Sequence, residues 1–444
     1  MSTAGAAYVR DARGVRDAMI ALIEQAERSI VLQMYLFAAN GHLSLVRPRA
    51  EAARHAGVVA DALIARQRRS PAMPIVVVLD SNTPDDPALV VTPSTLIAAR
   101  LREAGVVVLT ANLFHNRFDR GRWFPVAARL HHRQAQIPAE RWVEAQHRWQ
   151  VIHNVEDHRK NLVIDEGARA LVTSHNLIDV AHDWHENAFI VVGAAARTVF
   201  AQAQEALARA LEIPQRLEAR PRQRVCELAA APGGAGDGRG EDGGDDGGDA
   251  AVLASEEIRP RFEAVIDAAG PGAELDLATA YFSDLRVWHR LVAAAGRGAH
   301  VRVLVDDLVA LPLPRLHAAV VRGLANRAVL DAARTTHVPG LELRVFHSAA
   351  GAMMHLKTLI RRGPDPVVIG GQCNATPNSF NGAWTETDVE VTSPAVVAAA
   401  SAHVDWLWTH PASRALPPPG PWFGPQRRLA AAALAGFALV GLAP

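Results

Sequence analysis

Two segments of the chain combine side chains that can bind and cleave a phosphodiester. Each holds an imidazole, an ammonium two residues later and, further on, a carboxamide, and the six residues are His158, Lys160, Asn176, His355, Lys357 and Asn374. In a strand, residues i and i+2 project from the same face, so each histidine points the same way as its lysine. One such set can hold a phosphoryl group. Two sets that face each other can also carry out acid–base chemistry on it.

The first segment resembles the fingerprint of the phospholipase D superfamily, which reads HxKxxxxD followed by GSxN and usually occurs twice. It runs from His158 to Asp165 without a mismatch and continues with Ser174 and Asn176, where Thr-Ser replaces Gly-Ser. The stretch that begins at Asp157 looks most like the cardiolipin synthase branch of the superfamily. A single HxK pair is an unspecific pattern, whereas two pairs at matching places in a repeated scaffold are a specific one.

The second segment departs from the fingerprint at two positions. Arg362 stands where the family has Asp, and Gln372 stands where it has Ser. The resemblance implies that the family Asp lies beyond the substrate-facing residues and secures the local structure. We therefore expect Arg362 to meet Asp365 in the adjacent turn instead. The two departures also raise the hypothesis of an inactive homologue that only binds lipid or nucleic acid.

The resemblance implies a role for each residue of the site. It assigns His158 as the nucleophile, which forms a phosphohistidine, and His355 as the general acid and base. In the family a glutamate roughly ten residues after the motif asparagine orients a histidine, and Glu186 and Glu386 stand near that distance. The implied catalytic residues are His158, Lys160, Asn176, His355, Lys357, Asn374, Glu186 and Glu386, and the supporting residues are Asp165 and Ser174.

We predict no metal ion and no cofactor. The lysines and carboxamides supply the charge stabilisation that a metal would otherwise give, and the sequence has no obvious carboxylate cluster for Mg²⁺ or Zn²⁺. Several histidines of the first half lack a metal-ligand spacing, and we expect most of them to be solvated or structural. They include His131, His132, His175, His182 and His185.

The two segments lie in a scaffold that itself repeats. Amphipathic helical patterns alternate with apolar runs such as PIVVVLDS and HVRVLVDD, which indicates sheets covered on both faces. We predict an α/β fold of two pseudo-symmetric phospholipase D-like domains, each a mixed β-sheet flanked by helices, with the active site at their interface. The predicted boundaries are 1–228 and 253–415 for the domains, 229–252 for a Gly/Asp-rich flexible linker, and 416–444 for a Pro-rich segment and apolar tail.

Two stretches outside the repeated pattern bear on partners. Residues 112–150 combine arginines, among them Arg117, Arg120 and Arg122, with tryptophans. This composition suits lipid headgroups or nucleic-acid backbones, and the alternative is a solvated insertion that its tryptophans pack down. The uncharged residues 429–444 are either a packed or frayed end or a weak membrane-surface anchor.

The overall composition limits the class of protein. The chain has 444 residues, of which 49% are hydrophobic and 21% charged, as in soluble globular proteins. Its formal net charge is zero, which argues against a whole-surface nucleic-acid binder. Cys226 and Cys373 lie in different halves, and the N-terminus has no apolar signal region. We therefore expect a cytoplasmic protein, peripheral at the membrane, that is a monomer with an internal pseudo-dimer.

Three functions fit these patterns. The leading hypothesis is a phosphatidyltransferase or phospholipase D that acts on an anionic glycerophospholipid such as phosphatidylglycerol, with an alcohol or water as acceptor. The second is a nuclease or another DNA or RNA phosphodiesterase of the same fold, because fold alone does not fix the substrate. The third is the inactive binding homologue.

Overall fold

The computed structural model describes residues 5–38, 55–79, 93–110, 156–212, 219–231, 248–308, 326–348, 352–380 and 384–416. We call residues 5–231 the first half and 248–416 the second half. The Arg/Trp-rich stretch 112–150, the central part of the predicted linker and the tail beyond residue 416 lie outside the described residues. The predictions for those stretches therefore stay predictions.

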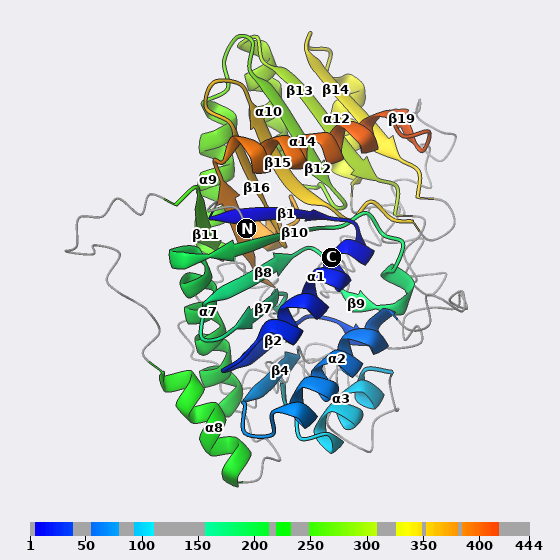
Figure 1. Ribbon diagram of the computed structural model, residues 1–444. Helices are drawn as coiled ribbons and strands as arrows, with labels where there is room; N and C mark the ends of the chain where they lie inside the picture. The colour runs from blue at the N-terminus through cyan, green and yellow to red at the C-terminus, as the bar shows by residue number, and fades with distance from the viewer. Residues whose placement is uncertain are drawn as a thin grey trace, which may run out of the picture.

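The first half is built on a mixed seven-stranded sheet (Figure 1). Its strand order is β1 (Ala6–Arg10), β10 (Asn187–Val192), β8 (Arg169–Thr173), β7 (Lys160–Ile164), β2 (Ile30–Met34), β4 (Ile75–Leu79) and β5 (Val107–Thr110). The last three strands are parallel to one another, and the others pair antiparallel. Helices α1 (Ala12–Gln25), α2 (His55–Arg69) and α3 (Pro93–Glu103) share one apolar cluster with the outer face of this sheet.

The second half repeats this topology. Its strand order is β11 (Ala250–Ala254), β18 (Thr387–Val391), β16 (Val367–Gly371), β15 (Lys357–Arg362), β12 (Glu274–Thr279), β13 (His300–Asp306) and β14 (Leu341–Phe346), with β19 (Ser413–Ala415) added at the edge. Helices α9 (Ser255–Asp267), α10 (Leu285–Gly296), α12 (Arg327–Thr335) and α13 (Pro377–Phe380) contribute to the apolar cluster on its outer face. The predicted α/β fold with two mixed sheets flanked by helices is confirmed.

Local sequence accounts for the helices that cover the outer faces. In α1 the buried residues Val15, Met19 and Leu22 recur at helical spacing, so a single apolar stripe faces the sheet. In α10 the side chain of Asp284 accepts hydrogen bonds from two main-chain N–H groups, those of Arg286 and Val287. This cap satisfies donors that the first turn of a helix otherwise leaves unpaired.

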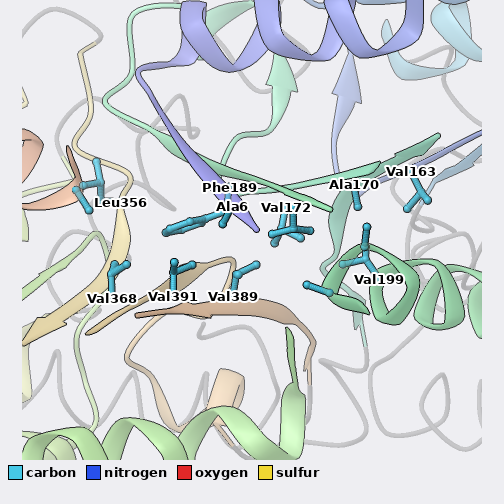
Figure 2. Packing of buried hydrophobic residues seen from close by; sticks show 14 of the residues in the cluster. Ala6, Val163, Ala170, Val172, Phe189, Val199, Leu356, Val368, Val389 and Val391 are labelled. Atoms are coloured by element: carbon cyan, nitrogen blue, oxygen red, sulfur yellow. The ribbon is translucent and has the colours of Figure 1, made fainter. Parts of the chain in front are cut away.

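The inner faces of the two sheets pack against each other. One apolar cluster joins Val172 and Phe189 of the first sheet to Val368, Val389 and Val391 of the second, and Figure 2 shows these side chains facing one another. Each buried valine or phenylalanine contributes about 1.5–3 kcal/mol before the entropy of ordering it is counted. The halves therefore share one continuous core.

Two long helices cross between the halves. Helix α7 (Gly193–Glu212) follows β10 and reaches β11 of the second sheet, and α14 (Pro394–Thr409) follows β18 and reaches β1 of the first (Figure 1). The two helices occupy equivalent places, because each follows the strand next to the edge of its own sheet. This exchange fixes the orientation of one half relative to the other.

The range predicted as a linker begins and ends in regular structure. Helix α8 (Ala219–Ala230) enters it, and β11 starts at Ala250 and pairs with β18 as an edge strand. The predicted range 229–252 is therefore longer than the stretch between these two elements. No helix within the described ranges is long and apolar enough to span a membrane.

Candidate active site

The two histidine–lysine pairs occupy equivalent places in the two sheets. Lys160 is the first residue of β7 and Lys357 is the first residue of β15, and both strands pair with the corresponding strand β2 or β12. Each lysine Nζ donates to the main-chain carbonyl of its own histidine, at 2.7 Å for His158 and 2.9 Å for His355. All four side chains are buried.

Each histidine is held by a glutamate from the opposite half. His158 Nδ1 lies 2.9 Å from Glu386 Oε2, and His355 Nδ1 lies 2.9 Å from Glu186 Oε1. Both carboxylates are fully buried. Spacing along the sequence points to the two glutamates but does not say which histidine each one contacts. The structure shows that the contacts are exchanged between the halves.

The main chain and a tryptophan accompany each glutamate across the interface. The N–H of His158 donates to the carbonyl of Thr385 at 3.1 Å, and the N–H of His355 donates to the carbonyl of His185 at 2.9 Å. The ring of Trp384 lies 4.9 Å from that of His158, and the ring of Trp184 lies 5.1 Å from that of His355, centroid to centroid. Each half therefore presents a Trp-x-Glu tip to the histidine of the other half.

The tryptophans are site residues that the sequence analysis missed. A signal for them exists, because each stands two residues before a site glutamate. Tyr35, which directly follows β2, was also missed. Its ring lies 4.5 Å from that of His158, and Lys160 Nζ lies 5.3 Å from its centroid. These aromatic rings therefore lie against the two histidines.

Asn176 and Asn374, which follow the two histidine–lysine pairs in the sequence, are both buried. The Oδ1 atom of each has no hydrogen-bond partner among the described residues. An unpaired buried amide is costly, and such groups are commonly found where a ligand completes them. The turn before Asn374 depends on Gly371, which has φ +153° and leaves no room for a Cβ, because that atom would lie 2.7 Å from the Thr387 carbonyl oxygen.

The two histidines and two lysines of the site influence one another electrostatically. Burial lowers the pKa of His158 well below its usual value, and Lys160, Lys357 and His355 lower it further. Burial also lowers the pKa of His355 to about 4, against the opposing effect of Glu186. The pKa of Lys357 falls to about 7, again through burial. The lysine of each half therefore acts on the histidine of the other, as in a single cationic site.

The surroundings shift the pKa of the two glutamates in opposite directions. Burial raises the pKa of Glu186, but His355 and His175 outweigh burial and hold this pKa well below its usual range. For Glu386 burial dominates and raises the pKa well above its usual range, with a further contribution from Asp388. The surroundings therefore favour the ionised form of Glu186 and disfavour the ionised form of Glu386.

Asp165 and Arg362 occupy equivalent motif positions but make different contacts. Asp165 Oδ1 accepts the main-chain N–H groups of the three residues that lead into β2, at 2.9, 2.6 and 3.2 Å. Arg362 pairs with Asp276 at 2.6 Å and with Asp405 of α14 at 2.8 Å. The expectation that Arg362 meets Asp365 is wrong, because the neighbouring Arg361 donates to the Asp365 carbonyl while Arg362 points to the other side of the strand.

The supporting serine and the replacement glutamine are also placed. Ser174 Oγ donates to Glu186 Oε2. Gln372, at the equivalent position of the second half, donates from Nε2 to Asn161 Oδ1 at 2.6 Å and accepts the N–H of Thr387 at 3.0 Å. Gln372 therefore links the two halves rather than holding a glutamate.

The histidines of the first half are more buried than a solvated set would be. His175 is fully buried and lies 3.3 Å from Glu186 Oε1 through its Nδ1. Its Nε2 lies 2.7 Å from Nε2 of the buried His55. His182 is also buried, and His185 contributes the main-chain contact to His355. His131 and His132 lie outside the described residues. Within the described ranges no group of three or more His, Cys, Asp or Glu side chains is arranged to hold a metal ion.

Comparison with known proteins gives a family match in the second half. A family model described as "Cardiolipin synthase, PLD-like domain" matches residues 263–408, which include the second histidine–lysine pair. No curated protein sequence matches the chain.

Solved structures extend the likeness to the whole chain. Phosphatidylserine synthase from Haemophilus influenzae Rd KW20 aligns with 100% of this chain and 96% of its own, with a TM-score of 0.66 at 13% identity. Polyphosphate kinase from Porphyromonas gingivalis covers 98% of this chain and 55% of its own, with a TM-score of 0.49 at 11% identity. Nuc from Salmonella typhimurium, a phospholipase D family member, covers 37% of this chain and 97% of its own, with a TM-score of 0.28 at 19% identity. Only the first of these three likenesses is close enough to support a shared fold.

Proposed function

We propose that this chain is a phosphatidyltransferase or phospholipase D of the phospholipase D superfamily and that it acts on glycerophospholipids; the family match over residues 263–408 supports this proposal. The observation that carries the proposal is the exchanged pair of histidine–glutamate contacts, each 2.9 Å long, at the junction of the two sheets. Two buried imidazoles, each oriented by a carboxyl group, are what a two-step displacement at phosphorus needs. The proposed substrate is an anionic phospholipid such as phosphatidylglycerol.

In the proposed reaction His158 Nε2 attacks phosphorus and forms a P–N bond while the bond to the leaving alkoxide breaks. His355 gives its proton to that alkoxide. In the second step His355 takes the proton of an alcohol or water, whose oxygen attacks phosphorus and releases His158. The lysines and Asn176 and Asn374 hold the phosphate oxygens throughout, because ammonium and amide groups stabilise the charge that develops there.

One observation favours the exchange of these two histidine roles. Burial favours the protonated form of Glu386. In that form Glu386 donates to His158 Nδ1, which leaves the imidazole proton on Nε2. That form suits a general acid. Glu186 is ionised and accepts from His355 Nδ1, which leaves Nε2 of His355 without a proton, as a nucleophile requires.

Trapping of the covalent intermediate separates the two role assignments. With a phosphate-labelled short-chain phospholipid and acid-free quenching, His158→Ala should lose both turnover and labelling. His355→Ala should slow the reaction by about 10²–10⁴-fold and let labelled protein accumulate. If His158→Ala keeps the label and His355→Ala loses it, the roles are exchanged. If neither variant changes labelling, the phosphohistidine mechanism is wrong.

A direct assay tests the substrate class. Pure protein is incubated with phosphatidylglycerol vesicles and, separately, with plasmid DNA, both in EDTA, and His158→Ala/His355→Ala protein is the control. We expect lipid products that need both histidines and an intact plasmid. Nicked plasmid without lipid products would support the nuclease, for which the composition of 112–150 is the motivating feature. Turnover that EDTA abolishes and a divalent ion restores would contradict the metal-independent mechanism.

We further propose that residues 112–150 and 429–444 bring the site to an anionic membrane surface. Each basic residue near such a surface contributes about 1 kcal/mol of binding, and salt screens this attraction. Flotation on phosphatidylglycerol liposomes compares the parent with Arg117→Ala/Arg120→Ala/Arg122→Ala and with a chain that ends at residue 428. We expect the arginine variant to lose more binding than the truncated chain, and equal flotation by all three would remove both stretches from the proposal.

A further inference from the structure

The carboxylate of Glu186 is shared by two imidazoles. His355 Nδ1 lies 2.9 Å from Oε1, and His175 Nδ1 lies 3.3 Å from the same atom. Ser174 Oγ donates to the other oxygen, Oε2. An ionised carboxylate can only accept hydrogen bonds, so both imidazoles donate to Glu186 through Nδ1–H.

A second buried histidine stands behind the first. His55 Nε2 lies 2.7 Å from His175 Nε2, so one proton lies between these two nitrogens. Burial lowers the pKa of His55 to about 2, with His175 the next cause, so His55 is neutral. Its Nδ1 is buried and has no hydrogen-bond partner in the part of the chain that the structure describes. The unbroken order of contacts is therefore His55, His175, Glu186 and His355.

We propose that His175, supported by His55, is a positioning residue that lowers the proton affinity of the Glu186–His355 pair. The inference rests on the proposed function, because it assigns a purpose to a proton at His355. A carboxylate that already accepts one imidazole N–H stabilises a second imidazolium less. His175 therefore weakens the hold of Glu186 on a proton at His355, and it does so whether His175 is neutral or protonated, since a neighbouring positive charge acts in the same direction.

The second half supplies a matched comparison for this arrangement. Cys373 occupies the position equivalent to His175, between Gln372 and Asn374. Its Sγ donates to the main-chain oxygen of Asn374 at 3.5 Å, and within the described residues it makes no hydrogen bond to Glu386. The sequence motif is duplicated, but the second imidazole is present on one side only.

Other charged groups face this chain of contacts from neighbouring elements. Arg16 of α1 and His182 lie near His55 and lower its pKa further, while Glu186 opposes them. On the other side Lys357 and Lys160 lower the pKa of His355. Replacement of His175 leaves Arg16, His182, Lys357 and Lys160 in place, so the variants proposed below share the direct effects of these four groups.

Titration of His355 by NMR tests the proposal without reference to any substrate. The chain contains 19 histidines, so the full-length protein is labelled with ¹³C at histidine Cε1 and the His355 signal is identified by its loss in His355→Asn. His175→Leu removes the second donor and should raise the pKa of His355 by about one unit. His175→Asn keeps an N–H near the Nδ1 position and should raise it less. Cys373→Ser should leave it unchanged.

A second measurement at neutral pH covers the case in which a variant unfolds in acid. The ¹H shift of the His355 Nδ1–H reports the strength of its hydrogen bond to Glu186, and it should move downfield in His175→Leu and less in His175→Asn. Where the leucine variant does not fold, the asparagine variant carries both measurements. An unchanged or lowered His355 pKa with an unchanged Nδ1–H shift would overturn the proposal.

The pH profile of kcat/KM on short-chain phosphatidylglycerol then links the proposal to turnover. A raised His355 pKa moves the basic limb to higher pH if His355 must be protonated, and it moves the acidic limb to higher pH if His355 must be neutral. His55→Leu should produce the same change at smaller size, because His55 acts only through His175. Absence of turnover in the parent would count against the proposed function alone, since the NMR result stands without it.

Discussion

The two histidine–glutamate pairs share their geometry and differ in their surroundings. Both hydrogen bonds are 2.9 Å long, both cross between the halves, and both carry a tryptophan two residues before the glutamate. Glu186 has Ser174 and His175 on its oxygens, whereas Glu386 lies near a further buried carboxyl group, that of Asp388. The comparison shows that the two motifs share the positions of their histidines and glutamates, while the neighbouring residues shift the pKa of the two glutamates in opposite directions.

The largest expected effect comes from replacing each glutamate with its neutral isostere. Glu186→Gln removes an ionised carboxylate and should reduce kcat by about 10²–10⁴-fold, as when a general acid or base loses its charge support. Glu386→Gln replaces a carboxyl group whose pKa burial raises with a neutral amide, and it should cost about tenfold or less, since a neutral hydrogen bond contributes about 1 kcal/mol. Steady-state kinetics on one lipid substrate compares the two variants.

The reverse order of these losses would break the comparison. If Glu386→Gln is the more damaging variant, Glu386 is ionised during turnover and the two pairs carry the same charge. Thermal unfolding of both variants is the control, because both glutamates are fully buried and a loss of folding would reduce kcat without any chemical cause.

A second contrast concerns the end of each motif strand. Restoring the family residue with Arg362→Asp would place a carboxylate beside Asp276 and Asp405 in place of an ion pair, and should cost about 2–4 kcal/mol of unfolding free energy. Arg302 still pairs with both acids, which limits the loss. Asp165→Asn keeps an oxygen for its main-chain donors and should cost about 1 kcal/mol.

Chemical denaturation measures both free energies. The activity of the folded fraction should be unchanged in Arg362→Asp, because Arg362 lies at the far end of β15 from Lys357. A variant as stable as the parent would mean that the ion pairs to Arg362 contribute nothing, and that the family residue and this one are interchangeable here.

A third contrast comes from Asp388, since Ala188 occupies the equivalent place after Glu186. Burial raises the pKa of Asp388 to about 6. The folded state therefore binds more protons than the unfolded state between the ordinary value of 3.8 and about 6. As pH rises through this window the folded state loses stability, and the full penalty is present above pH 6.

Asp388→Asn should therefore stabilise the protein above pH 6 by about 1–3 kcal/mol and change little below 3.8. The amide oxygen can still accept the N–H groups of Gln372 and Cys373, which lie 2.6 and 3.0 Å from Oδ1. Denaturant unfolding of parent and variant across this pH range measures the difference. A pH-independent difference would show that Asp388 does not titrate in the folded protein.

Sequence alone predicts the fold and the membership of the site for a physical reason. Apolar runs that alternate with amphipathic helices report burial on both faces of a sheet, and the spacing of His158 and Lys160 reports a shared face of a strand. Both signals come from residues that are close in the sequence, so they can be recognised without the tertiary structure. The roles assigned to the individual site residues stay predictions.

The features that sequence did not predict depend on contacts between distant parts of the chain. The partner of His158 is Glu386 and the partner of Arg362 is Asp405, and the spacing along either half contains no information about such pairs. The sequence also does not distinguish His175 from the solvated or structural histidines, because its neighbour His55 is the first residue of α2, 120 residues earlier in the chain. The contact between His158 and Glu386 crosses between the halves, and the other two join distant parts of the chain within one half.

The smallest expected effect concerns Gln372, which stands in the second half where Ser174 stands in the first. Ser174 holds Glu186, but Gln372 instead joins Asn161 of the first half to the main chain of Thr387. Gln372→Ser restores the family residue and removes this link, which should cost about 1–2 kcal/mol of unfolding free energy, because two buried polar groups lose a partner. Turnover of the folded protein should change by less than about tenfold, since Gln372 does not contact a glutamate of the site. Denaturant unfolding and kcat are measured on the same preparation, with Ser174→Ala as the matched variant.

Ser174→Ala should affect turnover more than stability, because it removes a donor from Glu186. Equal effects of the two substitutions on turnover would mean that the two motif positions are equivalent.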